Sequence, residues 1–438
     1  MQRSLKVYAV TLGCPKNRTD TEKLLARLLD LGVEPVLSPE EADLLVVNTC
    51  AFIRPAVRES LDTILALAEA KGPGQRLVVI GCLPARFREE ALASLPEVDL
   101  FLGIEAYREA ERLLLPKRDL ILRPEGPETT QRVLTESPFY AYLKVTEGCN
   151  HGCSFCTIPR IRGPLRSRPL EEILREAEGL LAQGVREIIL VGQDVSAYGL
   201  DQGQAALPEL LQALLKVLPC GARLRLLYLH PEGISSKLIE LLATEPALAP
   251  YLDLPVQHAH PDILRRMRRS YRAEDILRLV EELRRVRPGI GLRTSVIVGF
   301  PGEGKEEFAT LLSFLSEARF DHLGAFIYWP EEGTPAARLK SRPSQREARR
   351  RRHRVLALQR EISRENLRGR IGEEDLVLVT GYDQRGRPVG HAGFQAPEVD
   401  GHTVIVRGAP VEPGDVVRVR FVRSFTYDLW AEALEKWN

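Results

Sequence analysis

Short apolar runs alternate with amphipathic stretches over the first 125 or so residues. Three runs of strand-like character end in turn residues, at Lys6–Thr11, Leu44–Asn48 and Leu77–Gly81. Between them, Thr19–Leu31 and Pro55–Lys71 carry apolar residues at helical spacing. Continuous apolar strands interleaved with helices are typical of a parallel sheet that is covered on both faces. We therefore predict an N-terminal α/β domain over residues 1–125.

A second strand–helix series follows over residues 135–340. Its predicted strands are Tyr140–Lys144, Glu187–Val191, Arg223–Tyr228, Tyr251–Pro255, Arg293–Val298 and Leu323–Ile327. The helical stretches between them include Leu170–Ala182, Pro208–Leu218, Ile234–Leu242, Ala273–Val286 and Lys305–Ala318. Six such units predict a partial (β/α)6 barrel, with its chemistry at the carboxyl ends of the strands.

The last hundred residues change character twice. Residues 341–367 are charged and helical, which suits a connector, and residues 368–438 hold short strands separated by glycine turns. Predicted strands are Leu376–Thr380, His402–Val406 and Val416–Val422. Short strands with glycine turns are typical of a small β-barrel. The fold class expected for the whole chain is thus α/β, with a terminal β-barrel.

Composition places the chain among ordinary globular proteins. Its 438 residues are 44% hydrophobic and 28% charged, with a net charge of +1. No apolar run approaches the roughly 18 residues that span a bilayer, and the N-terminus does not resemble a secretory signal. We therefore expect a cytoplasmic protein. Because thiols stay reduced there, clustered cysteines favour metal or redox chemistry over disulfides.

A local basic run stands out against this near-neutral background. It comprises Arg346, Arg349, Arg350, Arg351, Arg352 and Arg354, all within the connector. Such a run is either the exposed face of a charged linker helix or a contact with ribosomal RNA.

Three widely spaced cysteines follow the three N-terminal strands. Cys14, Cys50 and Cys82 each lie just beyond the end of a predicted parallel strand. Ligands bind at that edge of an open α/β sheet, so the three thiols should converge there. The alternative is that all three are buried as small apolar side chains.

Three further cysteines form a compact triplet after the first strand of the barrel. Cys149, Cys153 and Cys156 have the spacing Cx3CxxC. Three thiolates can hold three corners of a [4Fe–4S] cube and leave the fourth iron open. A structural zinc site would need a fourth ligand, from His151 or a distant cysteine. The seventh cysteine, Cys220, lies in a predicted loop and has no assigned role.

The compact triplet resembles the signature of the radical S-adenosylmethionine enzymes. In that family S-adenosylmethionine chelates the open iron, and its reduction releases a 5′-deoxyadenosyl radical that takes hydrogen from a C–H bond. The cofactor carries this chemistry and the protein orients it. The resemblance implies cofactor contacts from residues of the triplet and of the strand ends: Phe155, Gln193, Gln257 and Val298. Each could instead be a core aromatic, a loop residue or a satisfied polar group. The segment from Val298 to Glu303 departs from the family at its next residue, where Gly304 replaces the usual Thr.

The three parts in order resemble the methylthiotransferases, in which the terminal barrel is called the TRAM domain. The resemblance implies a second [4Fe–4S] cluster on Cys14, Cys50 and Cys82, which holds the sulfur to be transferred. One branch of this family modifies adenosine in transfer RNA. The other, the RimO type, modifies an aspartate of small-ribosomal-subunit protein twelve. The segments Leu12–Asn17 and Tyr427–Ala431 are similar to the RimO type.

Charge gives a separate indication of the substrate. From Arg368 onward the chain has nine basic and eleven acidic residues. A barrel that grips phosphates should be basic, whereas a slightly acidic one suits a basic ribosomal protein.

The expected activity is therefore methylthiolation of the β-carbon of that aspartate. One S-adenosylmethionine would supply the radical and another the methyl group, and no side chain is assigned as a general acid or base. The resemblance also implies an electron donor such as flavodoxin or ferredoxin. Two alternatives remain at this stage: the same reaction on transfer RNA, and a non-catalytic iron–sulfur protein that binds RNA or senses redox state.

Overall fold

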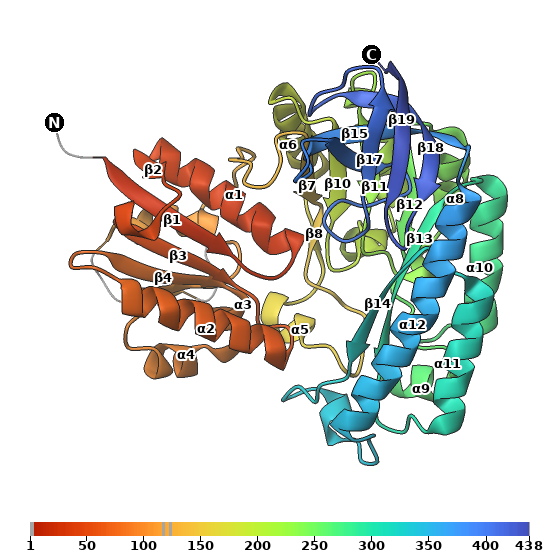
Figure 1. Ribbon diagram of the computed structural model, residues 1–438. Helices are drawn as coiled ribbons and strands as arrows, with labels where there is room; N and C mark the ends of the chain where they lie inside the picture. Colours follow the sequence, from red (N-terminus) through yellow and green to blue (C-terminus); the bar gives the residue numbers. More distant parts are fainter. Residues whose placement is uncertain (1–3, 116–118, 122–124, 438) are drawn as a thin grey trace. The chain divides into compact units, whose positions relative to one another are not determined.

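The computed structural model describes residues 4–115, 119–121 and 125–437, and these residues pack into two compact units (Figure 1). The first unit comprises residues 1–136, 142–152 and 156–180. The second comprises residues 137–141, 153–155 and 181–438. The stretch near Arg118–Gln131, whose proline and glycine residues predict a linker, lies partly outside the described residues, and the predicted domain boundaries stay predictions.

A parallel sheet of six strands forms the centre of the first unit. Its order is β2 (Val33–Pro35), β1 (Leu5–Thr11), β3 (Leu44–Thr49), β4 (Arg76–Gly81), β5 (Leu100–Leu102) and β6 (Asp119–Ile121). The three strands predicted from sequence are β1, β3 and β4, and they are neighbours. Their carboxyl ends therefore lie side by side, which is where the three dispersed cysteines follow.

Two apolar cores cover the two faces of this sheet. Along β3, Leu45 and Val47 belong to one core, while Leu44 and Val46 belong to the other. Successive side chains of a strand point to opposite faces, so an unbroken apolar run indicates burial on both. Figure 1 shows the two covering helices, α1 (Pro15–Asp30) and α2 (Arg54–Ala70), on opposite faces.

The remaining helical elements of the first unit, apart from the 3₁₀ turn Pro39–Glu41, are short or come from later in the chain. They are α3 (Cys82–Phe87), α4 (Glu89–Ser94), the 3₁₀ segment Ala106–Leu114, α5 (Ile158–Arg162) and α6 (Leu170–Ala182), the last of which ends beyond the unit. A short antiparallel pair, β8 (Thr146–Glu147) and β9 (Arg166–Ser167), frames the loop that carries the compact cysteine triplet.

An open sheet of six strands is the framework of the barrel region. Its order is β14 (His322–Ile327), β13 (Gly291–Val298), β12 (Leu248–Asp253), β11 (Arg223–Leu226), β10 (Glu187–Val191) and β7 (Tyr140–Lys144). The pairs from β10 to β14 are parallel. The accompanying helices are α7 (Leu207–Val217), α8 (Ser236–Thr244), α9 (Pro261–Met267), α10 (Ala273–Val286) and α11 (Lys305–Ala318). This confirms the predicted partial (β/α)6 barrel.

The connector and the terminal barrel complete the second unit. Helix α12 (Gln345–Gly369) runs along β14, and Gln359 donates to the Phe320 carbonyl at 2.7 Å. The closed barrel has the order β15 (Glu374–Tyr382), β16 (Pro388–Ala392), β17 (Thr403–Gly408), β19 (Leu429–Lys436) and β18 (Val416–Ser424).

The terminal barrel contacts the amino-terminal ends of the sheet strands. Glu187, the first residue of β10, binds Arg225 of β11 at 2.6 Å and His391 of β16 at 3.0 Å. Arg225 also donates to the Gly393 carbonyl at 2.8 Å. The terminal barrel thus lies at the amino-terminal end of the sheet strands. The cofactor is expected to bind at the opposite, carboxyl edge.

Several element boundaries differ from those predicted. Helix α1 begins at Pro15 rather than Thr19, because its polar first turns are buried by contacts with later segments. Strand β12 begins at Leu248 and ends at Asp253, earlier than the predicted Tyr251–Pro255. Strands β16 and β19 were not predicted, since neither has a continuous apolar run. None of the described helices is long and apolar enough to cross a membrane.

Candidate functional site

The dispersed cysteines lie together at the carboxyl edge of the first sheet. Cys14 is the N-cap residue of α1, Cys50 directly follows β3, and Cys82 is the first residue of α3. A Cβ on Gly13, next to Cys14, would lie 2.9 Å from Cys50 Sγ, and Asn17, three residues after Cys14, has its Oδ1 3.8 Å from Cys82 Sγ. The structure therefore brings together the three residues that sequence placed at three strand ends.

Glycines let the cysteine loops approach one another closely. Gly13 has φ +90°, and a Cβ there would lie 2.6 Å from the Cβ and 2.9 Å from the Sγ of Cys50. Gly81 has φ +91°, and its Cβ would lie 2.2 Å from Asn48 Oδ1. Only glycine fits both the backbone angle and the space at these positions.

Asn17 ties the ends of these strands together. Its Nδ2 donates to the carbonyls of Leu12 and Thr49, each at 2.9 Å. Its Oδ1 faces Cys82 Sγ at 3.8 Å. The side chain is fully buried, so these bonds form without competition from water. Sequence reasoning noted Asn17 only as part of a family motif and gave it no role.

The three thiols differ in their readiness to ionise. For Cys14, burial raises the pKa, but Lys16, Arg162 and the amides of Asn17 and Lys16 together bring it below the usual value. For Cys50, burial and the neighbouring Cys82 and Cys14 raise the pKa to about 12. Burial also raises the pKa of Cys82, although Arg162 opposes this shift.

This donor set suits a bound iron–sulfur cluster. Cysteine ligates a metal as the thiolate and not as the thiol, so cluster binding at Cys50 and Cys82 must release protons. Among the described residues, no three His, Cys, Asp or Glu side chains are arranged as for a single metal ion. Thiols that ligate different irons of a cube need not converge on one point. The chemistry of three adjacent thiols beside a guanidinium fits an iron–sulfur cluster.

A network of buried ion pairs lies behind the triplet. Arg162 of α5 donates to Cys82 Sγ at 3.4 Å, Asn17 Oδ1 at 2.6 Å and Glu147 Oε1 at 2.9 Å. Lys144 Nζ in turn binds Glu147 at 2.9 Å and Asp20 at 2.6 Å. Each charge is paired, as burial in a low dielectric requires.

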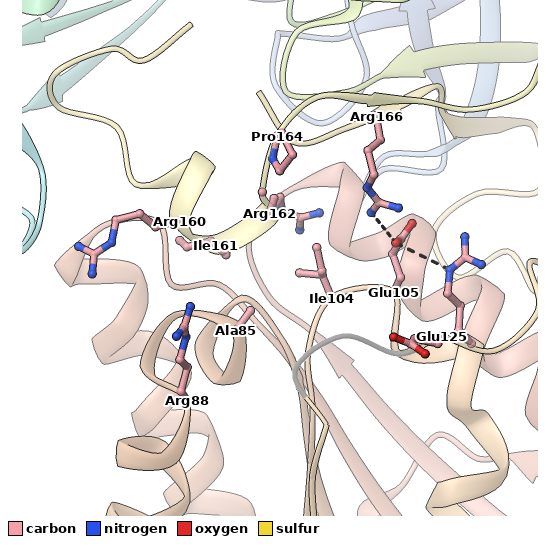
Figure 2. A pocket seen from close by; sticks show the side chains of 12 residues that line it. Ala85, Arg88, Ile104, Glu105, Glu125, Arg160, Ile161, Arg162, Pro164 and Arg166 are labelled. Carbon is pink, nitrogen blue, oxygen red and sulfur yellow. Dashed lines mark hydrogen bonds and ion pairs between the residues drawn. The ribbon is translucent and has the colours of Figure 1, made fainter. Parts of the chain in front are cut away.

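The same guanidinium lines a pocket of about 490 Å³ within the first unit (Figure 2). Five arginines and two glutamates contribute to its wall, together with apolar side chains such as Ile104 and Ile161. Figure 2 shows Arg166 pointing toward Glu105, which it binds at 2.8 Å. Arg162 thus both lines this pocket and contacts Cys82.

The compact triplet occupies the loop between β8 and α5. In the first unit, the Cys149 amide donates to the Gly163 carbonyl at 3.2 Å, and Cys156 Sγ accepts from the Ile158 amide at 3.4 Å. Cys153 belongs with the second unit, where the adjacent Ser154 hydroxyl donates to the Arg266 carbonyl at 2.6 Å. All three thiols are partly exposed.

The four residues expected to contact S-adenosylmethionine all belong to the second unit. Phe155 packs edge-on against Phe300, with ring centroids 6.5 Å apart. Gln193 and Gln257 follow β10 and β12, and Val298 is the last residue of β13. These last three therefore lie along one carboxyl edge of the parallel sheet, as expected of a ligand site.

Backbone strain marks one of these positions. Gln257 has φ +62°, and its amide and carbonyl are bonded to Ser295 and Ile297 of β13, each at 2.8 Å. A non-glycine residue held at positive φ is uncommon, and such strain concentrates at ligand sites.

Among the buried polar atoms near this edge, one on a histidine and one on a tyrosine have no hydrogen-bond partner within the described protein. They are His258 Nε2, after β12, and the Tyr328 hydroxyl, after β14. Burial lowers the pKa of His258 to about 3, so its imidazole is neutral. Buried polar atoms are normally satisfied, and a bound polar ligand would satisfy these. Sequence reasoning missed Tyr328, for which no motif gave a signal.

The basic run of α12 is partly used within the protein. Arg351 is buried and binds Glu303 at 2.9 Å, and Arg352 donates to the Ala325 carbonyl at 2.9 Å. Arg354 lies over the ring of Phe308. Arg346 and Arg349 are exposed. Part of the basic run therefore attaches α12 to the rest of the second unit, and a contact with ribosomal RNA stays a proposal.

Three family models match successive parts of the chain. Residues 6–103 match a family described as uncharacterized protein family UPF0004, residues 143–315 match the radical SAM superfamily, and residues 371–434 match the TRAM domain. The order of these matches agrees with the order of the domains predicted from sequence.

Curated relatives match along nearly the whole chain. A ribosomal protein uS12 methylthiotransferase RimO of Nitratidesulfovibrio vulgaris is 47% identical over 98% of this chain and 100% of its own length. The RimO protein of Geobacter sulfurreducens is 43% identical over 98% of both chains.

A solved structure of the radical S-adenosylmethionine methyltransferase TsrM from Kitasatospora setae shares the fold. Its TM-score is 0.57 at 16% identity, over 82% of this chain and 89% of that chain. At this identity the likeness concerns the fold alone.

Proposed function

Because this chain belongs to the RimO family of ribosomal protein uS12 methylthiotransferases, we propose that it methylthiolates the β-carbon of an aspartate in uS12. It is a radical S-adenosylmethionine enzyme, and its family uses a [4Fe–4S] cluster together with that cofactor. The observation that carries the proposal is full-length similarity combined with two separate cysteine triplets. The dispersed triplet lies at the carboxyl edge of a parallel sheet, and the compact triplet lies in the loop between β8 and α5.

The proposal includes two clusters rather than one. Cys149, Cys153 and Cys156 would hold the cluster that reduces S-adenosylmethionine. Cys14, Cys50 and Cys82 would hold a second cluster, which carries the sulfur to be transferred. The convergence of these three thiols supports the assignment, since Gly13 and Gly81 leave room for their close approach and for no side chain.

S-adenosylmethionine would supply a radical for hydrogen abstraction and, from a second molecule, the methyl group. The chain's residues would orient it at the carboxyl edge of the barrel sheet. Gln193 and the strained Gln257 would offer polar contacts, Phe155 an aromatic face and Val298 its backbone. His258 Nε2 and the Tyr328 hydroxyl have no hydrogen-bond partner among the described residues, and a bound cofactor would supply one. We therefore add them to the proposed contacts.

The protein substrate is favoured over transfer RNA by the curated relatives and by charge. The relatives are uS12-modifying enzymes by name. The terminal barrel has more acidic than basic residues, which suits a basic protein partner better than a phosphate backbone.

Paired product analysis tests this choice. Anaerobically reconstituted protein is incubated with S-adenosylmethionine, a reductant and sulfide, with either uS12 or transfer RNA, and each product is examined by mass spectrometry. We expect a methylthio group on the uS12 aspartate and none on the nucleoside. The reverse pattern would assign the protein to the RNA-modifying reaction. Absence of 5′-deoxyadenosine in both reactions would favour a non-catalytic iron–sulfur protein.

Iron analysis tests the number of clusters. The Cys14→Ala, Cys50→Ala, Cys82→Ala variant should lose about half of the bound iron and still form 5′-deoxyadenosine. The Cys149→Ala, Cys153→Ala, Cys156→Ala variant should also lose about half, but form none. Cys220→Ala, outside both triplets, is the matched control and should keep all its iron. Unchanged iron in the first variant would contradict the second cluster.

Three further parts of the proposal concern the cellular setting. We propose that the protein works in the cytoplasm and takes electrons from a flavodoxin or ferredoxin. We also propose that the exposed Arg346 and Arg349 contact ribosomal RNA when uS12 is modified within the small subunit. Charge reversal of both should then weaken binding to the assembled subunit while leaving the reaction on free uS12 unchanged.

A further inference from the structure

Arg162 contacts a proposed cluster ligand but belongs to the short helix α5, which follows the other triplet. It lies six positions after Cys156, at the end of α5, and its Nη2 approaches Cys82 Sγ at 3.4 Å. The same nitrogen donates to Asn17 Oδ1 at 2.6 Å. The guanidinium therefore meets a cysteine of the dispersed triplet together with the residue that joins the strand ends.

The position of this guanidinium is fixed from its other side. Nη1 donates to both oxygens of Glu147, at 2.9 and 3.0 Å. Glu147 is held in turn by Lys144. The side chain of Arg162 is 1% exposed, so water does not screen its charge from Cys82. A planar guanidinium can serve two such partners at once, whereas an ammonium group cannot hold them in the same geometry.

A fixed buried cation beside a cluster ligand has a predictable effect. Each added electron makes a thiolate-ligated cluster more negative, so a nearby positive charge stabilises the reduced state more than the oxidised state. The same charge stabilises the Cys82 thiolate itself.

We propose that Arg162 is a positioning residue of the N-terminal cluster, which fixes the Cys82 sulfur and raises the reduction potential of that cluster. This inference rests on the proposed function, in which Cys14, Cys50 and Cys82 hold a cluster. No bond is made or broken in this role. The alternative is that Arg162 only neutralises Glu147 and thereby stabilises the fold.

The potential of this cluster can be measured in isolation. Full-length Cys149→Ala, Cys153→Ala, Cys156→Ala protein should retain only the N-terminal cluster after anaerobic reconstitution. Into this background we would introduce Arg162→Gln, Arg162→Lys or Arg166→Gln. Arg166 is the matched control, because it pairs with Glu105 within the same unit and neighbourhood but is much more exposed. Iron content and an EPR-monitored redox titration are the readouts.

We expect Arg162→Gln to lower the reduction potential or to lose the cluster, and Arg162→Lys to lie between it and the parent. Arg166→Gln should match the parent in both readouts. If Arg162→Gln fails to fold, Arg162→Lys decides the question, because it keeps a positive charge within the ion-pair network.

Two results separate this inference from the proposed function. If the parent variant holds no iron, the second cluster itself is wrong. If it holds iron and both Arg162 variants have the potential and iron content of Arg166→Gln, Arg162 has only a structural role and the inference is overturned.

Discussion

Single residues decide whether the dispersed cysteines can meet. The sequence places each of them after a strand, but the close approach depends on glycines at positive φ. Gly81 and Gly13 precede Cys82 and Cys14. A methyl group at Gly81 would overlap Asn48 of β3, and one at Gly13 would overlap Cys50, which directly follows β3. The pattern Gly–Cys at two strand ends was visible in the sequence. Its steric meaning was not, because the atoms that a Cβ would meet come from another strand.

Replacement of Gly81 by alanine should therefore cost more than backbone strain alone. We expect a loss of about 2–4 kcal/mol in the free energy of unfolding, together with reduced iron content. Gly74→Ala is the matched control, since Gly74 has φ +83° but open space around it. It should cost only about 1 kcal/mol. Urea denaturation measures both. Equal losses in the free energy of unfolding would show that the overlap with Asn48 does not destabilise the Gly81→Ala variant.

At the scale of elements, apolar runs in strands and helical spacing of apolar residues were the reliable signals. Strands β7 and β10 and helices α6, α10 and α11 have the predicted bounds. The start of α1 was missed because its first turn includes Lys16 and Asn17, which are polar yet buried; Asp20 and Lys23, inside the predicted range, are also buried. Their burial is made tolerable by charged partners far along the chain, such as Lys144 for Asp20. Apolar periodicity reveals the helix from Thr19 onward but not its first turn, whose buried residues are polar.

The turn between β13 and α11 shows how a charge fixes an element. Glu303 is 2% exposed, and its Oε2 accepts from the Gly299 amide at 2.5 Å and the Phe300 amide at 3.1 Å. Its Oε1 accepts from Arg351 of α12 at 2.9 Å. Glu303, which belongs to the family motif, therefore attaches this turn to the connector helix α12.

Removal of this carboxylate should destabilise the second unit strongly. We expect Glu303→Ala to lose about 3 kcal/mol in chemical denaturation, because it leaves two amides without their acceptor and removes the buried carboxylate partner of Arg351. Glu347→Ala removes the other acidic partner of Arg351. The side chain of Glu347 is 29% exposed. That control should lose less than about 1 kcal/mol. Similar losses in the two variants would contradict the role given to burial.

At the scale of the whole molecule, buried charges attach the terminal barrel to the sheet of the second unit. Glu187 is shared by Arg223, Arg225 and His391. Burial alone would raise the pKa of Glu187, but these three partners hold it well below its usual range. Burial lowers the pKa of His391 from 6.5 to about 4, against the opposing effect of Glu187. The neutral imidazole is therefore the native form at neutral pH.

This depressed pKa makes the attachment sensitive to acid. Above pH 6.5 the imidazole is neutral in both folded and unfolded chains, and its contribution is complete. Between pH 6.5 and 4 the unfolded chain binds a proton that the folded chain does not. The free energy of unfolding therefore decreases as the pH is lowered through this range. From pH 7 to pH 5 the loss should be about 2 kcal/mol.

Urea denaturation at the two pH values measures this loss. His391→Gln should lose about 2 kcal/mol less than the wild-type protein on going from pH 7 to pH 5. The exposed His353, replaced by glutamine, is the control and should behave as the wild type. A wild-type-like pH dependence in His391→Gln would exclude this histidine as the acid-sensitive group.

The sequence by itself determined the fold class, the order of the three parts, the two cysteine triplets and the chemistry that they resemble. These features depend on short-range periodicity and on spacing along the chain, which a sequence displays directly. The tertiary structure alone decided that Asn17 joins the strand ends, that Arg162 reaches Cys82, and that His258 and Tyr328 hold unsatisfied polar atoms. Arg162 and Asn17 are 145 positions apart, and their contact exists only because folding brings α5 against the first sheet. Burial then gives such contacts their strength, since the pairing of charges matters most where water is excluded.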